Sequence, residues 1–417
     1  MNEMFKTFTM IVGMIVMLCF LYQGVYAVLG LIKRPKVFKA NQLHKYAVLI
    51  SARNESTVIT NLIESVRAQE YPSELIDIFV VADNCTDNTA EVAKKAGAKV
   101  IERRNKVQQG KGYALNFLLN HINRHYGLKA YDGYFVFDAD NVLEKNYVEK
   151  MNDVFDNGYR IITSYRNSKN YDSNWISAGS ALWFLRECRF VNNVRMILGV
   201  SCTISGTGFL VNSDIFAENN GWKHFLLTED IQFSADSILK GERIGYCADA
   251  VFYDEQPIHI IDAWNQRLRW TKGFYQVFGR YGKQLITKAV QELNFSCYDM
   301  FITLLPAIGF TIISGSFSAM SLVVSLWNPK LILLEAMRLV FFALLNMYLT
   351  FFILGFMTTI TEWKKIYCSP IRKLLYMFTF PIFMLMYVPL TYVALFTKAK
   401  WKPIRHSVVV TVNEIRG

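Results

Sequence analysis

The apolar residues of this chain gather towards its two ends, and this distribution limits the folds that it can adopt. An uninterrupted apolar stretch covers residues 9–32, and further long apolar stretches cover residues 301–327, 331–359 and 374–396. Each stretch is long enough to cross the apolar core of a bilayer as a helix. The residues between them have the mixed composition of a soluble protein. The chain therefore combines a soluble domain with helices that span a membrane or lie on it.

Basic residues directly after the first apolar stretch predict the side on which the soluble domain lies. They are Lys33, Arg34, Lys36 and Lys39. Positive charges next to a span favour the cytoplasmic side, so we expect residues 41–283 to be cytoplasmic. A cleaved signal peptide is the alternative, but the apolar stretch is too long and no cleavage site of small residues follows it.

The C-terminal stretches give conflicting signals about the last crossing. Three crossings after residue 300 would place the C-terminus outside, yet Lys398, Lys400, Lys402 and Arg405 form a basic cluster there that favours the cytoplasm. Pro381 and Pro389 interrupt the stretch 374–396, so we expect this segment not to cross completely. The predicted parts are a membrane helix with its basic flank at 1–40, a cytoplasmic domain at 41–283, an interfacial helix at 284–300, membrane or interface helices at 301–400, and a tail at 401–417.

The net charge of +11 is compatible with nucleic acid, anionic lipid or an anionic substrate as a partner. No nucleic-acid motif is present, and the membrane stretches make lipid headgroups the simpler partner. The 7 cysteines are scattered without a C-x-x-C pair, as expected for reduced thiols in a cytoplasmic domain. The sequence does not predict an oligomeric state.

The cytoplasmic part alternates between strand and helix patterns. We expect strands at 45–52, 76–82, 98–102 and 133–137, and helices at 55–69, 87–96 and 110–124. This alternation is typical of an α/β domain with parallel strands and right-handed crossovers. Ligands of such sheets bind beyond the carboxyl ends of the strands, which points to residues 53–55, 83–87 and 138–141.

Acidic residues lie at these strand ends. Asp138 and Asp140 follow the fourth strand, where two carboxylates can hold a hard cation that neutralises a diphosphate leaving group. A solvated or helix-capping pair is the alternative. Asp83 ends the second strand and can contact a base or a ribose, whereas Asp87 is suited to capping the next helix.

Two further motifs follow along the chain. A carboxylate of Thr228-Glu229-Asp230, at a helix start, suits a general base. Taken alone, however, this motif favours helix capping, with Thr228 as the cap and the acids facing the helix dipole. Gln266, Arg269 and Trp270 share one helix face, where an amide, a guanidinium and an indole suit a diphosphate and a sugar ring. An interfacial helix anchored by its tryptophan is the alternative for this second motif.

Taken in order, Asp83, the D-x-D at Asp138, the T-E-D at Thr228 and the Q-x-x-R-W at Gln266 resemble the membrane-integrated family 2 glycosyltransferases. These include the processive synthases of cellulose, hyaluronan, chitin and poly-N-acetylglucosamine. The resemblance covers residues 45–280 by motif and nearly the whole chain by architecture. It implies a GT-A fold, which is a Rossmann-like α/β domain with a mixed, mostly parallel sheet, accompanied by helical transmembrane segments.

The resemblance also implies the roles of individual residues. It implies a UDP-sugar donor, Mg²⁺ or Mn²⁺ at Asp140 with Asp138 nearby, and Asp230 as the general base. The other implied substrate-binding residues are Glu55 and Asp83 for uridine, Lys111 near the nucleotide, Gln266 and Arg269 for the diphosphate, Trp270 for the acceptor, and Glu229, Gly206 and Thr207. One departure concerns Asn84, where many members carry a second acid. No third metal ligand is predicted.

We therefore expect an inverting enzyme that elongates a β-linked polysaccharide and exports it across a bacterial plasma membrane. A β-glucan made from UDP-glucose is the preferred product. Hyaluronan-like or N-acetylglucosamine polymers, and transfer of one sugar to a lipid-linked acceptor, are the alternatives. A transporter or scaffold with an inactive transferase domain is a third possibility, against which the intact Asp140, Asp230 and Arg269 argue.

Overall fold

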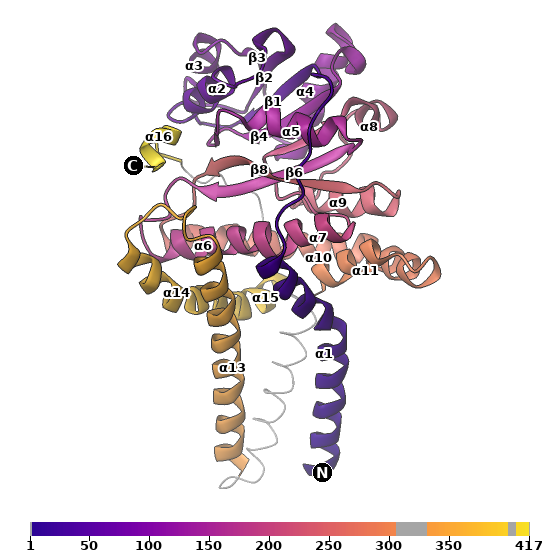
Figure 1. Ribbon diagram of the computed structural model, residues 1–417, viewed down its shortest axis with the longest axis vertical. Coiled ribbons are helices and arrows are strands. Elements are labelled where there is room, and N and C mark those ends of the chain that lie inside the picture. The colour runs from indigo at the N-terminus through magenta and orange to yellow at the C-terminus, as the bar shows by residue number, and fades with distance from the viewer. Residues whose placement is uncertain (1, 306–331, 399–405, 417) are drawn as a thin grey trace.

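The protein is built around a mixed sheet, and its structure is a computed structural model that describes residues 2–305, 332–398 and 406–416. The eight-stranded sheet lies above a layer of helices, from which long helices project (Figure 1). The order of its strands is β3-β2-β1-β4-β7-β6-β8-β5. The first elements of the domain are β1 (Tyr46–Ala52), α2 (Ile59–Arg67), β2 (Ile76–Asp83), α3 (Thr89–Lys95), β3 (Lys99–Arg103), α4 (Lys111–His125) and β4 (Gly133–Asp138).

The strands β1 to β4 form the parallel part of the sheet, as their sequence predicts. In register, Tyr46 of β1 lies opposite Ile76 of β2 on one side and opposite Gly133 of β4 on the other. These strands are continuous apolar runs because helices cover the sheet and both faces of the strands are buried. Their carboxyl ends consequently meet at one edge.

The second half of the sheet is mixed. It contains β5 (Val142–Leu143), α5 (Tyr147–Asp156), β6 (Ile161–Ser168), β7 (Phe209–Asn212), α8 (Ser213–Glu218) and β8 (Ile244–Asp254). The strand β7 is antiparallel to both β4 and β6, whereas β6 and β8 pair in parallel. As a result, β6 and β8 run in the same direction as β4, and their carboxyl ends open onto the same edge.

A layer of helices underlies the sheet (Figure 1). It contains α6 (Trp175–Arg186), a π-helix (Glu187–Asn192), α7 (Asn193–Leu198), α9 (Glu229–Leu239), α10 (Ile260–Gln291) and α11 (Phe295–Leu304). The rod formed by α6, the π-helix and α7 lies between the sheet and the apolar helices of the chain.

The predicted interfacial helix at 284–300 is divided between two helices. The chain breaks after Gln291 because Leu293 has a positive φ of 50°. Asn294 then caps the next helix, where its side chain accepts a hydrogen bond from the Cys297 N–H at 3.1 Å. The predicted domain boundary at residue 283 lies inside α10, which continues through it.

Four apolar helices complete the described chain. They are α1 (Asn2–Ile32), α13 (Ile332–Thr361), α14 (Pro370–Leu385) and α15 (Tyr387–Phe396), with the short α16 (Val412–Arg416) near the C-terminus. Both α1 and α13 project away from the domain, whereas α14 and α15 lie across its underside (Figure 1). The predicted stretch 9–32 and residues 332–359 of the predicted stretch 331–359 are therefore helical. Most of 301–327 falls outside the described residues.

Two described segments are long and apolar enough to cross a membrane by length and composition, Val340–Thr361 and Pro370–Phe396. They differ in burial. Of the most apolar 18 residues of each segment, 6% are buried inside the protein in the first and 44% in the second. The second segment is thus partly occupied by contacts with the domain. Whether 374–396 crosses completely stays a prediction.

Candidate active site

The turn after β4 is held by a hydroxyl from another part of the chain. The Asp138 N–H donates to Thr207 Oγ1 at 2.9 Å, and the Thr207 hydroxyl in turn bonds the side chain of Asn141. Thr207 is 1% exposed, and its side chain fixes the shape of the D-x-D turn. Its role in substrate binding stays a prediction.

Asp140 lies in the same turn and is almost completely buried. Its Oδ2 accepts a hydrogen bond from the Glu255 N–H at 2.9 Å, just beyond the end of β8. Burial acts to raise the pKa of Asp140, but the positive charges of His406 and Lys169 hold the pKa below its usual value. Asp140 is therefore an anion at neutral pH.

Lys111 connects the D-x-D turn to the loop beside the predicted base. Its ammonium pairs with Asp138 and donates a hydrogen bond to the carbonyl oxygen of Gly206 at 2.7 Å. Gly206 has a φ of 85°, and Asp230 Oδ2 lies 3.6 Å from the point where a Cβ on this residue would stand. Asp138, Lys111, Gly206 and Asp230 are thus neighbours in the fold.

A buried ion pair anchors the other side of the Gly206 loop. Arg166 of β6 donates from Nε to Asp254 at 2.8 Å and from Nη1 to the Ser205 carbonyl oxygen at 2.9 Å. Neither Arg166 nor Asp254 stands out in the sequence, because each lies in an ordinary strand pattern. Their importance follows from β6 and β8 ending at the same edge as β4.

The T-E-D motif begins α9, but its threonine does not cap the helix. The side chain of Thr228 accepts no cap hydrogen bond, and its Oγ1 is buried without a hydrogen-bond partner among the described residues. Thr228 instead packs against Gly273 of α10, where an added Cβ would come within 2.5 Å of it. The capping interpretation therefore does not hold for Thr228.

The two acids of this motif are strongly perturbed by their surroundings. Burial raises the pKa of Glu229 to about 7, and the neighbouring charge of Asp230 adds to this shift. Burial also raises the pKa of Asp230, against the opposing effects of Lys111 and Arg269. Two close carboxylates titrate as a pair, which raises the pH at which both are ionised.

The two arginines of Gln266-Arg267-Leu268-Arg269-Trp270 face different surroundings. Arg269 is half-buried, and its charge acts on Glu229 and Asp230, yet no described residue forms an ion pair or hydrogen bond with it. Arg267 is completely buried, and its guanidinium lies 4.3 Å from the centre of the Phe383 ring of α14. Arg269 is therefore free to bind a ligand, whereas Arg267 joins α10 to its neighbours.

The other members of this motif lie close together. Gln266 Oε1 accepts a weak hydrogen bond from Arg267 Nη1 at 3.4 Å, and the Arg267 guanidinium lies 5.4 Å from the centre of the Trp270 ring. The ring of Trp270 meets the edge of Phe184 of α6 at 6.0 Å between centroids. Trp270 thus lies at the seam between α10 and α6.

The predicted nucleoside contacts lie at the ends of β1 and β2. Asp83 is buried and pairs with Arg103 Nη1 at 2.6 Å. Asn84 next to it has a φ of 54°, accepts a hydrogen bond from the Asn105 N–H at 2.8 Å, and donates one to the Asn105 carbonyl at 3.1 Å. Asparagine tolerates this left-handed conformation, and an ionised acid could not donate the second bond, which explains the departure from the family pattern.

The C-terminal segment returns to the carboxyl edge of the sheet. His406 Nδ1 lies 3.0 Å from Glu55 Oε1, and the Val408 N–H donates to Glu255 Oε2 at 2.9 Å. Burial opposes the charged form of His406, but the charge of Asp140, together with those of Glu55 and Glu255, raises the pKa of His406 to about 10. No local motif surrounds His406 in the sequence, so only the fold reveals that it lies at the site.

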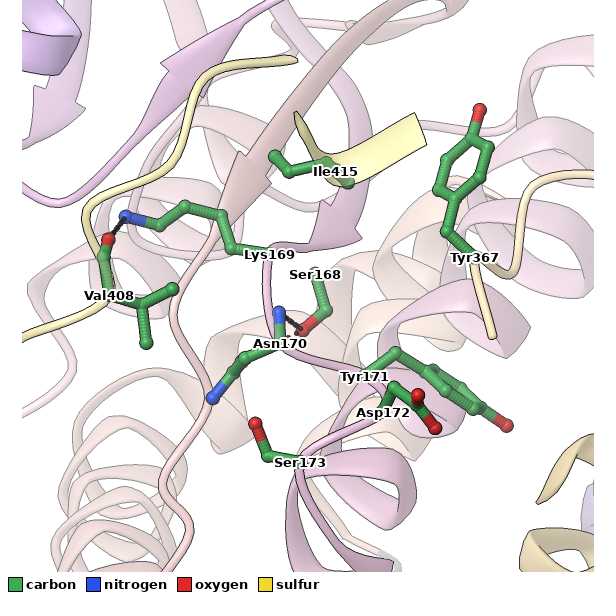
Figure 2. Close-up of a pocket in the computed structure, with 9 residues that line it drawn as sticks. All are labelled: Ser168, Lys169, Asn170, Tyr171, Asp172, Ser173, Tyr367, Val408 and Ile415. Carbon is green, nitrogen blue, oxygen red and sulfur yellow. Dashed lines mark hydrogen bonds between the residues drawn. The ribbon is translucent and has the colours of Figure 1, made fainter. Parts of the chain in front are cut away.

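A cavity of about 270 Å³ lies beside this segment. Figure 2 shows Lys169 reaching the Val408 carbonyl, with a distance of 3.1 Å from Nζ, and Ile415 on the side of the C-terminal helix. The cavity is also lined by residues 168–173 and by Tyr367. The C-terminal segment therefore forms one of its walls.

The carboxylates of the D-x-D turn fit a divalent cation that binds together with a nucleotide. Within the described ranges, no group of three histidines, cysteines or acids is arranged to hold a metal by itself. Mg²⁺ is commonly held by one or two carboxylates together with substrate phosphates. The ionised Asp140 and the half-buried Asp138 provide that donor set.

Curated relatives are similar to a large part of the chain. The chain is 26% identical to the probable glycosyltransferase YdaM of Bacillus subtilis, over 63% of this chain and 63% of that protein. It is 25% identical to poly-beta-1,6-N-acetyl-D-glucosamine synthase of Staphylococcus aureus, over 60% of this chain and 58% of that protein. It is 23% identical to beta-monoglucosyldiacylglycerol synthase of Synechocystis, over 58% and 50%. The match thus spans less than two thirds of the length of each of these relatives.

The fold is that of GT-A-like enzymes. The solved structure of the mannosyltransferase PcManGT from Pyrobaculum calidifontis, in complex with GDP-Man and Mn2+, is similar to this chain with a TM-score of 0.56. The similarity covers 91% of this chain and 95% of that chain, at 15% sequence identity. A model of the glycosyltransferase like family 2 matches residues 44–273, which is more than half of the chain. The protein belongs to this family of glycosyltransferases.

Proposed function

We propose that this protein is a metal-dependent, inverting glycosyltransferase. It transfers the sugar of a UDP-sugar to a hydroxyl group of an acceptor at a membrane surface. The observation that carries this proposal is the connection from Asp138 through Lys111 to the Gly206 carbonyl, beside Asp230. It brings the side suited to a diphosphate and the side suited to a general base next to each other.

The reaction is a single displacement. Asp230 accepts the proton of the acceptor hydroxyl. At the same time, the oxygen of that hydroxyl attacks the anomeric carbon from the face opposite the diphosphate. The bond from the anomeric carbon to the diphosphate oxygen breaks, and the nucleoside diphosphate leaves with the bonding electron pair. An α-linked donor then yields a β-glycoside.

Positive groups at the site stabilise the charge that develops on the leaving diphosphate. Lys111 and the unpaired Arg269 are the protein groups suited to this role, because fixed charges in a site shielded from water act strongly. Asp138 and Asp140 would hold the divalent cation, Mg²⁺ or Mn²⁺, which when bound neutralises part of the diphosphate charge. Glu55 and Asp83 would contact the nucleoside beyond the ends of β1 and β2.

The proposed product is a β-linked polysaccharide, preferably a β-glucan made from UDP-glucose. Trp270, half-buried at the seam between α10 and α6, supports a sugar as the acceptor. The names of two relatives keep the alternatives open, because one makes an N-acetylglucosamine polymer and another a glucosyl lipid. Transfer of one sugar to a lipid-linked acceptor is therefore the second candidate.

The apolar helices support a location at a bacterial plasma membrane with the catalytic domain in the cytoplasm. Exposed apolar side chains of α13, such as Phe341 and Ile353, suit a lipid environment, and the basic residues after α1 suit anionic headgroups. The contact of His406 with Glu55 brings the C-terminal segment to the same side as the sheet. This placement agrees with an incomplete crossing by α14 and α15.

Membranes that contain the protein provide the test. They are incubated with radiolabelled UDP-glucose, UDP-N-acetylglucosamine, UDP-glucuronate or GDP-mannose, each alone and mixed, with Asp230→Asn as the inactive control. A high-mass product that glycosidases degrade supports the polymerase, and an organic-soluble labelled lipid supports single transfer. If no donor is consumed, or if the Asp230→Asn protein is as active as the wild type, the proposal is wrong.

A further inference from the structure

A second cavity lies between α4, the loop that follows β3, and Phe225. Its volume is about 400 Å³, which is larger than that of the cavity beside the C-terminal segment. Asp138, Asp140 and Asp230 do not line it. Both β3 and α4 lie at the end of the domain away from the projecting helices α1 and α13 (Figure 1). The cavity is therefore separate from the candidate active site and remote from the segments that could enter a membrane.

One face of α4 forms a wall of this cavity. The wall consists of Tyr113, Asn116, Phe117 and Asn120, whose spacing places them along one side of a helix. A Cβ added to Gly221 would stand 3.0 Å from Asn116 Oδ1 and 3.6 Å from Asn120 Oδ1. The two side-chain amides are therefore neighbours at the turn of Gly221. Asn120 lies nine residues beyond the start of α4, or roughly 13 Å along the helix from Lys111.

These two amides are available to a ligand. Asn116 and Asn120 are half-buried, yet neither side-chain amide forms a hydrogen bond with any residue that the structure describes. In the same cavity wall, by contrast, Asn105 Oδ1 accepts hydrogen bonds from the N–H groups of Val107 and Gln108 at 3.0 and 2.9 Å. Each free amide offers two donors and one acceptor, a combination that matches hydroxyl groups, which both donate and accept.

An aromatic pair supplies apolar surface beside the amides. The rings of Tyr113 and Phe225 are stacked, with 4.6 Å between their centroids and 18° between their planes. Each ring covers one face of the other, and Phe225 remains 39% exposed, so part of its surface is open to a ligand. Amides next to an aromatic surface suit a sugar ring, which has hydroxyl groups at its edge and an apolar face.

The charges around the cavity favour a neutral ligand. Arg103 donates to Asp83 at 2.6 Å and to the Gln108 carbonyl oxygen at 2.7 Å, so its guanidinium is already used. Arg104 is exposed to water and lies 3.8 Å from the carboxylate of Glu102. Neither arginine offers an isolated positive charge inside the cavity, which argues against a phosphate or a nucleotide as the ligand.

We propose that Asn116, Asn120 and the stacked pair of Tyr113 and Phe225 form a binding site for a neutral oligosaccharide, separate from the place of sugar transfer. The amides bind hydroxyl groups, and the aromatic pair contacts the apolar face of a sugar ring. This site would retain a saccharide chain on the enzyme without taking part in the chemistry. The inference goes beyond the proposed function, because binding at this site requires no turnover.

The test measures binding to the full-length protein in lipid nanodiscs, with Asp230→Asn as the parent so that a bound saccharide is not extended. Saturation-transfer NMR follows titrations with cellopentaose, N-acetylated chitopentaose and maltopentaose. Asn120→Ala removes one amide of the cavity. The matched control is Asn123→Ala, an exposed position of the same helix that does not line the cavity. Trp270→Ala alters the predicted acceptor side of the candidate active site.

We expect saturable binding of at least one of these oligosaccharides. Asn120→Ala should weaken it roughly three- to tenfold, the range for loss of a neutral hydrogen bond. Asn123→Ala and Trp270→Ala should keep the affinity within about twofold of the parent, as for changes at independent sites. Asn120→Ala should unfold at the temperature of the parent, since its amide has no described partner to lose in the free protein.

Three results would overturn the inference. The first is the absence of saturable binding by all three oligosaccharides. The second is binding that Trp270→Ala removes and Asn120→Ala leaves unchanged, because the saccharide would then occupy the candidate active site. The third is displacement of the oligosaccharide by inorganic pyrophosphate, which would show that the cavity takes an anion. A protein that consumes no sugar donor would contradict the proposed function alone, since this binding does not depend on transfer.

Discussion

Lys111 Nζ lies 2.7 Å from the carbonyl oxygen of Gly206 and pairs at the same time with the carboxylate of Asp138. One side chain at the start of α4 thus holds two strand-end loops that are far apart in the sequence. Because the loop of Gly206 also approaches Asp230, the position of the base relative to the D-x-D turn depends on this lysine.

Replacement of Lys111 by methionine should therefore reduce transfer strongly. We expect kcat to fall by roughly 10²- to 10³-fold, the range for loss of one fixed group that stabilises developing charge. The donor KM should rise as well, because a positive charge near the diphosphate is lost. Steady-state kinetics of UDP release measure both quantities, with Lys94→Met on the distant helix α3 as the control. A kcat close to that of the wild type would contradict the role of Lys111.

The pair formed by Glu229 and Asp230 predicts a pH dependence of the rate. Asp230 must be deprotonated to act as a base, and burial raises the pKa of both acids, that of Glu229 to about 7. Activity should therefore increase with pH along an acid limb whose apparent pKa belongs to the pair. Glu229→Gln removes the neighbouring negative charge, which makes ionisation of Asp230 easier, so the acid limb should move to lower pH.

The pH profile of kcat for the wild type and for Glu229→Gln checks this prediction. The direction of the shift is the critical observation, because a general loss of activity without a shift would mean that the two carboxylates titrate independently. Asp249→Asn, at an exposed position of β8, is a suitable control for a change of net charge and should leave the limb in place.

His406 predicts that the C-terminal segment contributes to donor binding. In His406→Ala, Glu55 loses its positively charged partner, and the uncompensated acids near Asp140 should repel the diphosphate. We expect the donor KM to rise roughly tenfold, in line with the loss of one charge-assisted interaction. Titration calorimetry with UDP and divalent cation measures this effect directly. The exposed His125 of α4 provides the matched control, and equal UDP affinities of the two variants would refute the prediction.

The close approach of α9 and α10 predicts opposite effects of alanine at two glycines of the same helix. At Gly273 an added Cβ would meet the Thr228 side chain at 2.5 Å, so Gly273→Ala should lower the free energy of unfolding by about 1–3 kcal/mol. At Gly279 no atom lies within 4 Å of the added Cβ, so Gly279→Ala should raise it by about 0.5–1 kcal/mol.

Thermal unfolding of both variants in detergent measures these changes. Because Thr228 precedes Glu229 and Asp230 directly, Gly273→Ala should also reduce activity at temperatures where the protein remains folded. Equal unfolding temperatures for the two variants would mean that Thr228 moves aside without cost.

The sequence by itself determined the parallel half of the sheet and the order of the motifs. The apolar runs that became β1, β2 and β4 are buried on both faces and need no distant partner to be recognised. Asp83, Asp138 and Asp230 could be selected because strand ends and helix starts are local features. The break at Leu293 could not, since a positive φ at a leucine has no clear sequence signal.

Only the tertiary structure decided which of these residues act together. Thr207 proved to hold the D-x-D turn, and Arg166 proved to anchor the Gly206 loop, because each outcome depends on packing between segments far apart in the chain. The same holds for His406, which reaches Glu55 across 351 positions of sequence. Hydrogen bonding and burial at such separations follow from how the strands and helices are assembled, and the local pattern around each residue contains no information about them.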